Sequence, residues 1–276
     1  MKLIDTHAHL NFSDYDNDRK KVIENSLKNE VFMINVGTNY NSSKFAVEIA
    51  KNYENGVYAS IGLHALNIGR GNEEKNTAGF KPEDVSEQEF DSKLYKKLAE
   101  SKKVVAIGEV GLDYYYKPKT NKKLAEMKEK QLAILKKEMD LAHALDLPII
   151  FHCRMAHDDL IQLLKKESKK GKKIKGVIHC FTATPDQMKQ YLEFGFCIGL
   201  NGIIFKMNLD EQIKSCPKER IVVETDCPFL TPPPLTGRNE PQYLTYVVDR
   251  VALIRSESAK EVASYSTANA KQLFGI

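Results

Sequence analysis

Eight short apolar runs, separated by longer segments with helical periodicity, dominate this sequence of 276 residues. The runs, rich in β-branched residues, are Leu3–Ile4, Val31–Val36, Val57–Ile61, Val104–Ile107, Pro148–Phe151, Gly176–Ile178, Phe196–Gly199 and Ile221–Val223. Three intervening segments carry apolar residues three or four positions apart: Leu124–Leu145, Asp159–Lys166 and Asp186–Phe194. Strands that alternate with helices predict a parallel sheet, and eight such units predict a TIM (β/α)8 barrel.

The length fits one domain over residues 1–276, because (β/α)8 barrels reach this size as one unit. No stretch approaches the roughly 18 apolar residues of a membrane span, and Asp5 interrupts the N-terminus before a secretory core could form. Five cysteines without a close pairing motif fit reduced thiols. We therefore expect a soluble protein with no membrane partner, in the cytoplasm or, in a eukaryote, also in the nucleus.

Side chains that can bind metal ions follow six of the eight apolar runs. They are His7, His9, His64, Glu109, His152, His179, Glu224 and Asp226. In a parallel barrel the C-terminal ends of the strands converge on one face, where active sites are built. Scattered core residues would not be expected to gather after strands in this way, so the pattern predicts a metal centre on that face.

These residues belong to longer motifs that occur in a fixed order. The motifs are Asp5–Leu10, Ile61–His64, Ile107–Tyr114, His152–Arg154, His179–Thr182, Glu224–Leu230 and Asn239–Pro241. In this order they resemble the TatD family of metal-dependent deoxyribonucleases, within the amidohydrolase superfamily, nearly end to end. The resemblance implies a TIM barrel with a divalent metal centre at the C-terminal ends of the strands. It also implies a 3'-5' exonuclease that hydrolyses phosphodiester bonds of single-stranded DNA in DNA repair or degradation.

For such a centre we expect two divalent metal ions, Mg2+, Mn2+ or Zn2+, because imidazole and carboxylate ligands suit several of them. The expected ligands are His7, His9 and Asp226 for one ion, His152 and His179 for the other, and Glu109 as the bridge. A carboxylate has two oxygens to share, which an imidazole does not. Asp226 and Glu109 are the expected catalytic residues, with Asp226 accepting the proton of the attacking water.

Six further residues are expected on the substrate side: His64, Arg154, Glu224, Tyr114, Tyr115 and Arg238. Arg154 could hold a phosphate through its planar donors, and an ion pair with a neighbouring carboxylate is the alternative. Glu224 could orient another site group or make a structural hydrogen bond. Tyr114 and Tyr115 precede two lysines and could stack an unpaired base, the alternative being a packed tyrosine cluster. Arg238 lies in a loop that is leaner in basic residues than is usual in the family.

Other polar segments are expected to lie outside the site. The lysine-rich run over residues 165–175 precedes the sixth predicted strand, so it is expected at the opposite face as a solvated surface. Residues 67–91 predict a long polar loop on the active face, followed by a helix over about residues 90–101. His143 lies within a helical pattern and is expected to be structural, whereas the role of His157 is left open.

The predicted activity is that of a metal-dependent deoxyribonuclease with single-stranded DNA ends as substrate, and RNA is left open. A net charge of +4 permits nucleic-acid binding without requiring it. One alternative is an amidohydrolase-superfamily enzyme that acts on a carboxylic ester or amide, with the same ions polarising a carbonyl. A nucleic-acid-binding protein without catalysis is a second alternative, and the intact ligand set argues against it.

Overall fold

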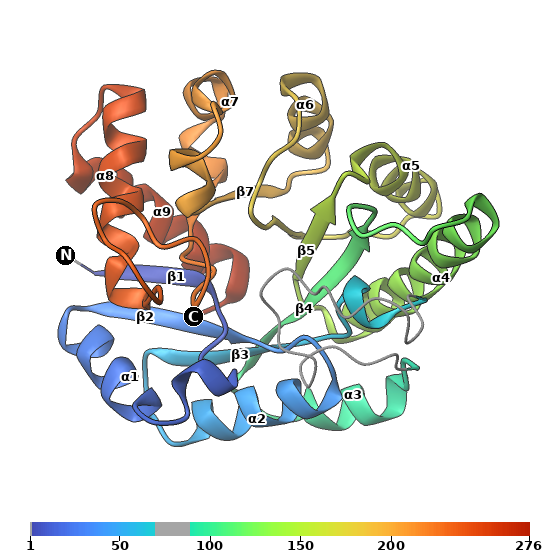
Figure 1. The fold of residues 1–276 in the computed structure, drawn as a ribbon, viewed down its shortest axis with the longest axis horizontal. Coiled ribbons are helices and arrows are strands. Elements are labelled where there is room, and N and C mark those ends of the chain that lie inside the picture. The colour runs from blue at the N-terminus through green and yellow to red at the C-terminus, as the bar shows by residue number, and fades with distance from the viewer. Residues whose placement is uncertain (1, 70–88) are drawn as a thin grey trace.

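Eight parallel strands form one sheet in sequence order in a computed structural model that describes residues 2–69 and 89–276. The strands are β1 Leu3–Ala8, β2 Val31–Val36, β3 Val57–Ile61, β4 Val104–Asp113, β5 Ile149–Arg154, β6 Gly176–Ile178, β7 Cys197–Leu200 and β8 Ile221–Val223. Each strand pairs in parallel with the next, and the sheet curls into a nearly closed barrel with helices outside it (Figure 1). The predicted TIM barrel is confirmed.

Helices follow the strands along the chain, as parallel strand connections require. They are α1 Arg19–Lys28, α2 Tyr40–Lys51, α3 Ser92–Leu98, α4 Asn121–Leu145, α5 His157–Ser168, α6 Pro185–Glu193, α7 Asp210–Ser215, α8 Leu244–Arg255 and α9 Ala259–Phe274. Several begin at a capping residue: Thr184 accepts a hydrogen bond from the Gln187 backbone and Gln187 reciprocates at the start of α6. No helix in the described part of the chain combines the length and apolar character needed to span a membrane.

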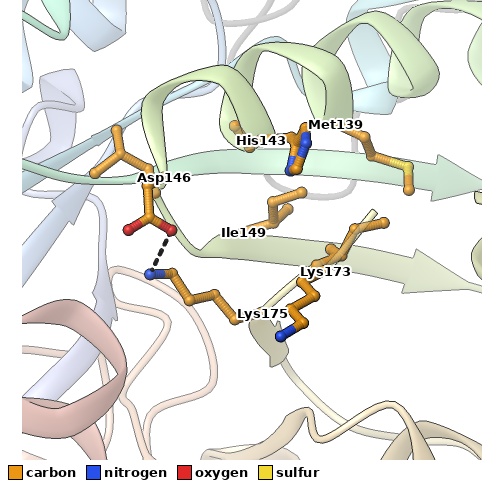
Figure 2. Close-up of a pocket in the computed structure, with 9 residues that line it drawn as sticks. Met139, His143, Asp146, Ile149, Lys173 and Lys175 are labelled. Atoms are coloured by element: carbon orange, nitrogen blue, oxygen red, sulfur yellow. Dashed lines mark ion pairs between the residues drawn. The ribbon is translucent and has the colours of Figure 1, made fainter. Parts of the chain in front are cut away.

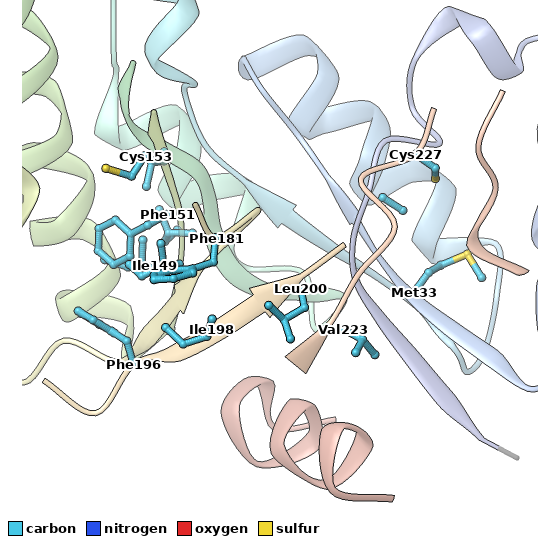
Figure 3. Close-up of a cluster of buried hydrophobic side chains, with 14 of the residues drawn as sticks. Met33, Ile149, Phe151, Cys153, Phe181, Phe196, Ile198, Leu200, Val223 and Cys227 are labelled. Carbon is cyan, nitrogen blue, oxygen red and sulfur yellow. The ribbon is translucent and has the colours of Figure 1, made fainter. Parts of the chain in front are cut away.

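Two buried hydrophobic clusters occupy the two faces of the sheet, because alternate side chains of a strand point in opposite directions. On β5, Ile149 and Phe151 belong to the larger cluster (Figure 3). This cluster also contains residues of the surrounding helices, such as Leu160. Ile150 lies between them in sequence and belongs to the smaller cluster, with Val177 of β6. The clusters hold the strand ends in fixed positions on a rigid scaffold.

Side chains and a single bridge join the first and last strands. One isolated parallel bridge links Ala8 to Cys227, just beyond β8. The buried Asp5 carboxylate accepts hydrogen bonds from the Thr225 backbone N–H at 2.9 Å and from the Thr225 hydroxyl at 2.6 Å. We refer to this junction of β1 with β8 and residues 225–227 as the β1/β8 seam.

Three strands extend well beyond the apolar runs that predict them. β1 continues from Ile4 to Ala8, β4 continues from Ile107 to Asp113 and β5 continues to Arg154, so His7, Glu109 and His152 lie within strands rather than after them. The reason is that these polar side chains face a shared interior site, where burial does not require an apolar residue. The helix expected over about residues 90–101 is the shorter α3, and residues 70–88 of the expected loop lie outside the described residues.

Candidate metal centre

The Glu109 carboxylate lies among five imidazoles, those of His7, His9, His64, His152 and His179. Its Oε1 atom is 2.8 Å from His152 Nδ1 and 3.5 Å from His179 Nε2. Its Oε2 atom is 3.4 Å from His7 Nε2 and 3.6 Å from His9 Nε2. Each oxygen therefore faces a different histidine pair, which is the geometry that a bridging carboxylate needs.

Asp226 completes the half that contains His7 and His9. Its Oδ1 atom is 3.8 Å from His7 Nε2 and 3.6 Å from His9 Nε2. The residue adopts a left-handed backbone conformation, with φ of 58°, and its backbone N–H donates to the His7 carbonyl at 2.9 Å. The β1/β8 seam therefore positions this carboxylate relative to the two histidines of β1.

The orientation of His9 leaves its inner nitrogen suited to a metal. His9 Nδ1 lies 2.9 Å from the Val36 carbonyl oxygen, which can only accept, so Nδ1 carries the proton. In the neutral ring His9 Nε2 then carries the free lone pair, and this atom lies 3.1 Å from His7 Nε2. Two imidazole nitrogens that converge at this distance, in a fully buried position, form a suitable pair of cation ligands.

The charge states of Glu109 and Asp226 also fit a cation site. Burial alone would raise the pKa of Glu109, but His64, His7 and His152 outweigh it and hold that pKa well below its ordinary value. Burial likewise opposes ionisation of Asp226, and His179 and His9 nevertheless lower its pKa. Both carboxylates are therefore anionic at neutral pH.

Together these groups form a donor set that fits divalent cations. Among the described residues, four combinations bring candidate ligand atoms within 4.8 Å of one another: His7 with His9 and Asp226, His7 with His179 and Glu224, His64 with Glu109 and His152, and His179 with Cys180 and Asp226. In addition, Glu109 Oε2 is buried and makes no hydrogen bond to any residue that the structure describes. A buried anionic oxygen without a donor is expected where a cation binds.

His64 lies beside this centre, close to Glu109. Its Nδ1 atom accepts a hydrogen bond from the Leu66 backbone N–H at 3.0 Å, so in the neutral ring the proton is on Nε2. That atom is 3.1 Å from Glu109 Oε1. The predicted position near the metals matches this geometry, and the predicted contact with substrate stays a prediction.

Arg154 and Tyr115 form a stacked pair next to the centre. The Arg154 guanidinium carbon lies 3.7 Å from the centroid of the Tyr115 ring. Within residues 2–69 and 89–276 no carboxylate pairs with Arg154, so the ion pair considered as an alternative is not formed. Tyr115 is 49% exposed, which leaves part of its ring open to a ligand.

Three other residues with predicted substrate roles, Tyr114, Arg238 and Glu224, are engaged with protein groups. Tyr114 is buried and its hydroxyl donates to Asp159 at 2.9 Å, which corresponds to the packed alternative. The Arg238 guanidinium donates to both oxygens of Asp18, at 2.9 and 2.7 Å, and to Glu240 at 3.0 Å. A substrate contact from Arg238 would require release of these pairs, so both substrate contacts stay predictions.

The third, Glu224, is fully buried behind His179 rather than in an open position. Its Oε1 atom is 2.8 Å from His179 Nδ1 and accepts hydrogen bonds from the Cys180 backbone N–H at 2.7 Å and Asn201 Nδ2 at 3.0 Å. These contacts fit the orienting role considered for Glu224. Its contact with substrate stays a prediction.

Asp113 is a site residue that the sequence reasoning missed. Its Oδ2 atom lies 3.0 Å from His152 Nε2, and its backbone N–H donates to Gln131 Oε1 of α4 at 3.0 Å. One signal was available, because Asp113 is four residues after Glu109 and an extended strand places both on one face. Gln131 carries no comparable signal, since its position in a helix says nothing of its partner in β4.

The remaining histidines and the lysine-rich run lie outside the centre. His157 is buried and its Nδ1 atom is 3.0 Å from the Tyr191 hydroxyl, whereas His143 is exposed on α4. In the lysine-rich run, Lys175 pairs with Asp146 at 3.0 Å beside a small pocket at the end of α4 (Figure 2). This end of α4 leads into the N-terminal end of β5, so Lys175 and the pocket lie at the face opposite the metal centre. This is the face predicted for the lysine-rich run.

Comparisons with known proteins agree with a metal-dependent hydrolase. A family model described as TatD related DNase matches residues 4–275. The chain is 34% identical over 279 residues to the uncharacterized metal-dependent hydrolase YabD of Bacillus subtilis, with 99% of each chain covered. It is 31% identical over 285 residues to the 3'-5' ssDNA/RNA exonuclease TatD of Erwinia tasmaniensis, covering 99% of this chain and 100% of the relative. The crystal structure of YJJV, a TatD homologue from Escherichia coli, matches with a TM-score of 0.80 and 26% identity, over 99% of this chain and 98% of that one.

Proposed function

Because the chain belongs to the family of TatD-related DNases, and is thus a metal-dependent hydrolase, we propose that it is a 3'-5' exonuclease acting on single-stranded DNA. RNA is a second substrate class in this proposal, since a relative 31% identical is named an ssDNA/RNA exonuclease. The observation that carries the proposal is the placement of Glu109 between two histidine pairs, each facing one of its oxygens.

Two divalent cations held by these groups would polarise the phosphoryl group and lower the pKa of the attacking water. In the proposal His7, His9 and Asp226 would hold one cation, His152 and His179 would hold the other, and Glu109 would serve both. Asp226 would accept the proton of the attacking water. Its side chain is 14% exposed whereas that of Glu109 is 3% exposed, so Asp226 is the more accessible anionic carboxylate of the two.

Arg154 supports a phosphate substrate over a carboxylic ester or amide. It lies two residues after His152 on β5, so both side chains leave the same face of the strand. Its guanidinium is stacked on Tyr115 and makes no ion pair with any described carboxylate. A preoriented guanidinium with free planar donors binds a phosphate in two-point geometry, and the exposed Tyr115 ring can stack an unpaired base.

The cellular setting is part of the same proposal. The five cysteines are all free thiols in the structure, and four of them are buried. Free thiols persist in the reducing cytoplasm, where we place the enzyme. DNA repair or degradation is the process that we propose for it.

The test is digestion of single-stranded DNA, labelled at its 5' end or its 3' end, by purified protein with added Mg2+, Mn2+ or Zn2+. We expect a metal-dependent ladder from the 5'-labelled strand and immediate release of a labelled mononucleotide from the 3'-labelled strand. A chelator and Asp226→Asn should each abolish cleavage, and Asp226→Asn should leave DNA binding largely intact. Asp186→Asn, at an exposed carboxylate on α6, is the matched control. Absence of cleavage by metal-loaded protein would exclude the nuclease and favour ester or amide substrates.

A further inference from the structure

Two buried carboxylates lie behind the histidines of one half of the centre. His152 Nε2 is 3.0 Å from Asp113 Oδ2, and His179 Nδ1 is 2.8 Å from Glu224 Oε1. In both rings the opposite nitrogen faces Glu109 Oε1, at 2.8 Å from His152 Nδ1 and 3.5 Å from His179 Nε2. Each imidazole therefore connects an outer carboxylate to the bridging carboxylate.

The other half of the centre is built differently. The outer nitrogen of His9 donates to the neutral carbonyl of Val36 at 2.9 Å. The outer nitrogen of His7 is buried and makes no hydrogen bond within the described parts of the chain. This half also has Asp226 beside its two histidines, with Oδ1 3.8 Å from His7 Nε2 and 3.6 Å from His9 Nε2, although Asp226 also lies within 4.8 Å of His179.

From this asymmetry we propose that Asp113 and Glu224 are positioning residues that selectively set the affinity of the His152 and His179 half for its divalent ion. The inference rests on the two-ion centre proposed above. A carboxylate that accepts the outer N–H of an imidazole fixes the ring tautomer, so that the lone pair is on the inner nitrogen, and makes that nitrogen a stronger donor.

Asp113 is held in place independently of any ion. Its Oδ1 atom accepts a hydrogen bond from the Tyr115 backbone N–H at 2.9 Å. Its own backbone N–H and carbonyl contact the Gln131 amide, at 3.0 and 3.3 Å. Since Gln131 also donates to the Ala65 carbonyl at 3.1 Å, α4 fixes the end of β4 against the loop after β3.

Glu224 is fixed equally firmly. The Cys180 backbone N–H and the Asn201 amide both donate to its Oε1 atom, at 2.7 and 3.0 Å. A Cβ atom on Gly199 would lie 2.7 Å from Glu224 Oε2, so the glycine leaves the space that this carboxylate fills. Both outer carboxylates are thus preorganised for the imidazoles they contact.

The experiment is calorimetric titration of metal-free, full-length protein with Mn2+. Wild-type protein should bind two equivalents. Asp113→Asn and Glu224→Gln should each weaken one equivalent by about 10- to 100-fold and leave the other unchanged. Asp226→Asn, which changes the opposite half, should weaken the other equivalent, and Asp186→Asn on α6 should change neither.

The histidine ring nitrogens provide a second readout, by 15N NMR of the metal-free protein. In the Asp113→Asn variant the new side chain would keep an oxygen for the Tyr115 N–H and turn its amide N–H toward His152 Nε2. In the variant His152 Nε2 should therefore be an acceptor without a proton, while Nδ1, which faces Glu109, keeps its proton. A role for Asp113 in folding alone would not remove the proton from Nε2.

The outcomes separate this inference from the proposed function. Binding of fewer than two equivalents by wild-type protein would overturn the two-ion centre and the inference with it. Two equivalents in the wild type, with both weakened alike or neither weakened in Asp113→Asn and Glu224→Gln, would overturn the inference and leave the two-ion centre standing.

Discussion

Replacement of Glu138 by glutamine should change how the stability of the protein depends on pH. Glu138 lies on α4 and is fully buried. Its Oε1 atom accepts a hydrogen bond from the Leu63 backbone N–H at 2.8 Å, and its Oε2 atom has no hydrogen-bond partner among residues 2–69 and 89–276. Burial raises the pKa of this carboxyl well above its ordinary value of 4.5, and the Leu63 N–H only partly opposes the shift.

The sign of the effect follows from proton binding. Above the ordinary pKa the unfolded chain releases the Glu138 proton, whereas the folded protein retains it up to the raised pKa. The free energy of unfolding therefore falls across that interval, by about 1.4 kcal/mol for each pH unit. Glutamine keeps an oxygen for the Leu63 N–H and cannot titrate, so Glu138→Gln should be free of this loss.

The measurement is urea denaturation of both proteins at successive pH values above the ordinary pKa of the carboxyl, where the shift acts. The variant should gain stability relative to the wild type as the pH rises, with a slope approaching about 1.4 kcal/mol per unit. Glu129→Gln, at an exposed position on the same helix, should show no such gain. Wild-type and Glu138→Gln curves that run parallel over the whole range would refute the reasoning.

Four further predictions follow from the geometry. Tyr115→Ala should weaken binding of single-stranded DNA more than binding of duplex DNA in a fluorescence anisotropy titration, and equal losses would exclude stacking. Tyr114→Phe should cost about 0.5–1.5 kcal/mol in urea denaturation through the lost Asp159 hydrogen bond, with DNA binding unchanged; weaker DNA binding would instead indicate a substrate contact. Gly111→Ala should prevent accumulation of folded protein, because its Cβ would lie 1.9 Å from the His152 carbonyl oxygen and its φ is 153°; a soluble variant with wild-type thermal stability would contradict this. Chelation should lower the melting temperature, and Mn2+ at 100 times its dissociation constant should stabilise the fold by about 2.7 kcal/mol; a melting temperature insensitive to both would argue against a resident ion.

The sequence predicts the barrel well because each strand is a compact apolar run followed by a helical pattern. The bounds of β2, β3, β6 and β8 agree with the predicted runs. β1, β4 and β5 were predicted too short because the later half of each carries polar residues, such as His7, Glu109 and His152, that are buried by one another. The pattern of apolar residues predicts strand positions that are buried against apolar neighbours. It does not predict positions where polar side chains are buried inside a polar site.

The six expected ligands converge because strand ends converge in a barrel, which strand positions alone can indicate. The partners of other site residues depend on contacts that no local pattern encodes. Arg238 pairs with Asp18, 220 residues away, and Asp113 is fixed by Gln131 of α4. The sequence marks such residues as polar and leaves open whether they meet substrate or protein.

The β1/β8 seam also determines when catalysis becomes available during synthesis. His7 and His9 emerge from the ribosome with the first strand, but Asp226 emerges only after the eighth strand has been translated. A nascent chain that presents the first seven strands therefore lacks the carboxylate that completes the His7 and His9 half. Under the proposed function, a partly synthesised chain cannot cleave nucleic acid, including the messenger RNA that is being read to make it.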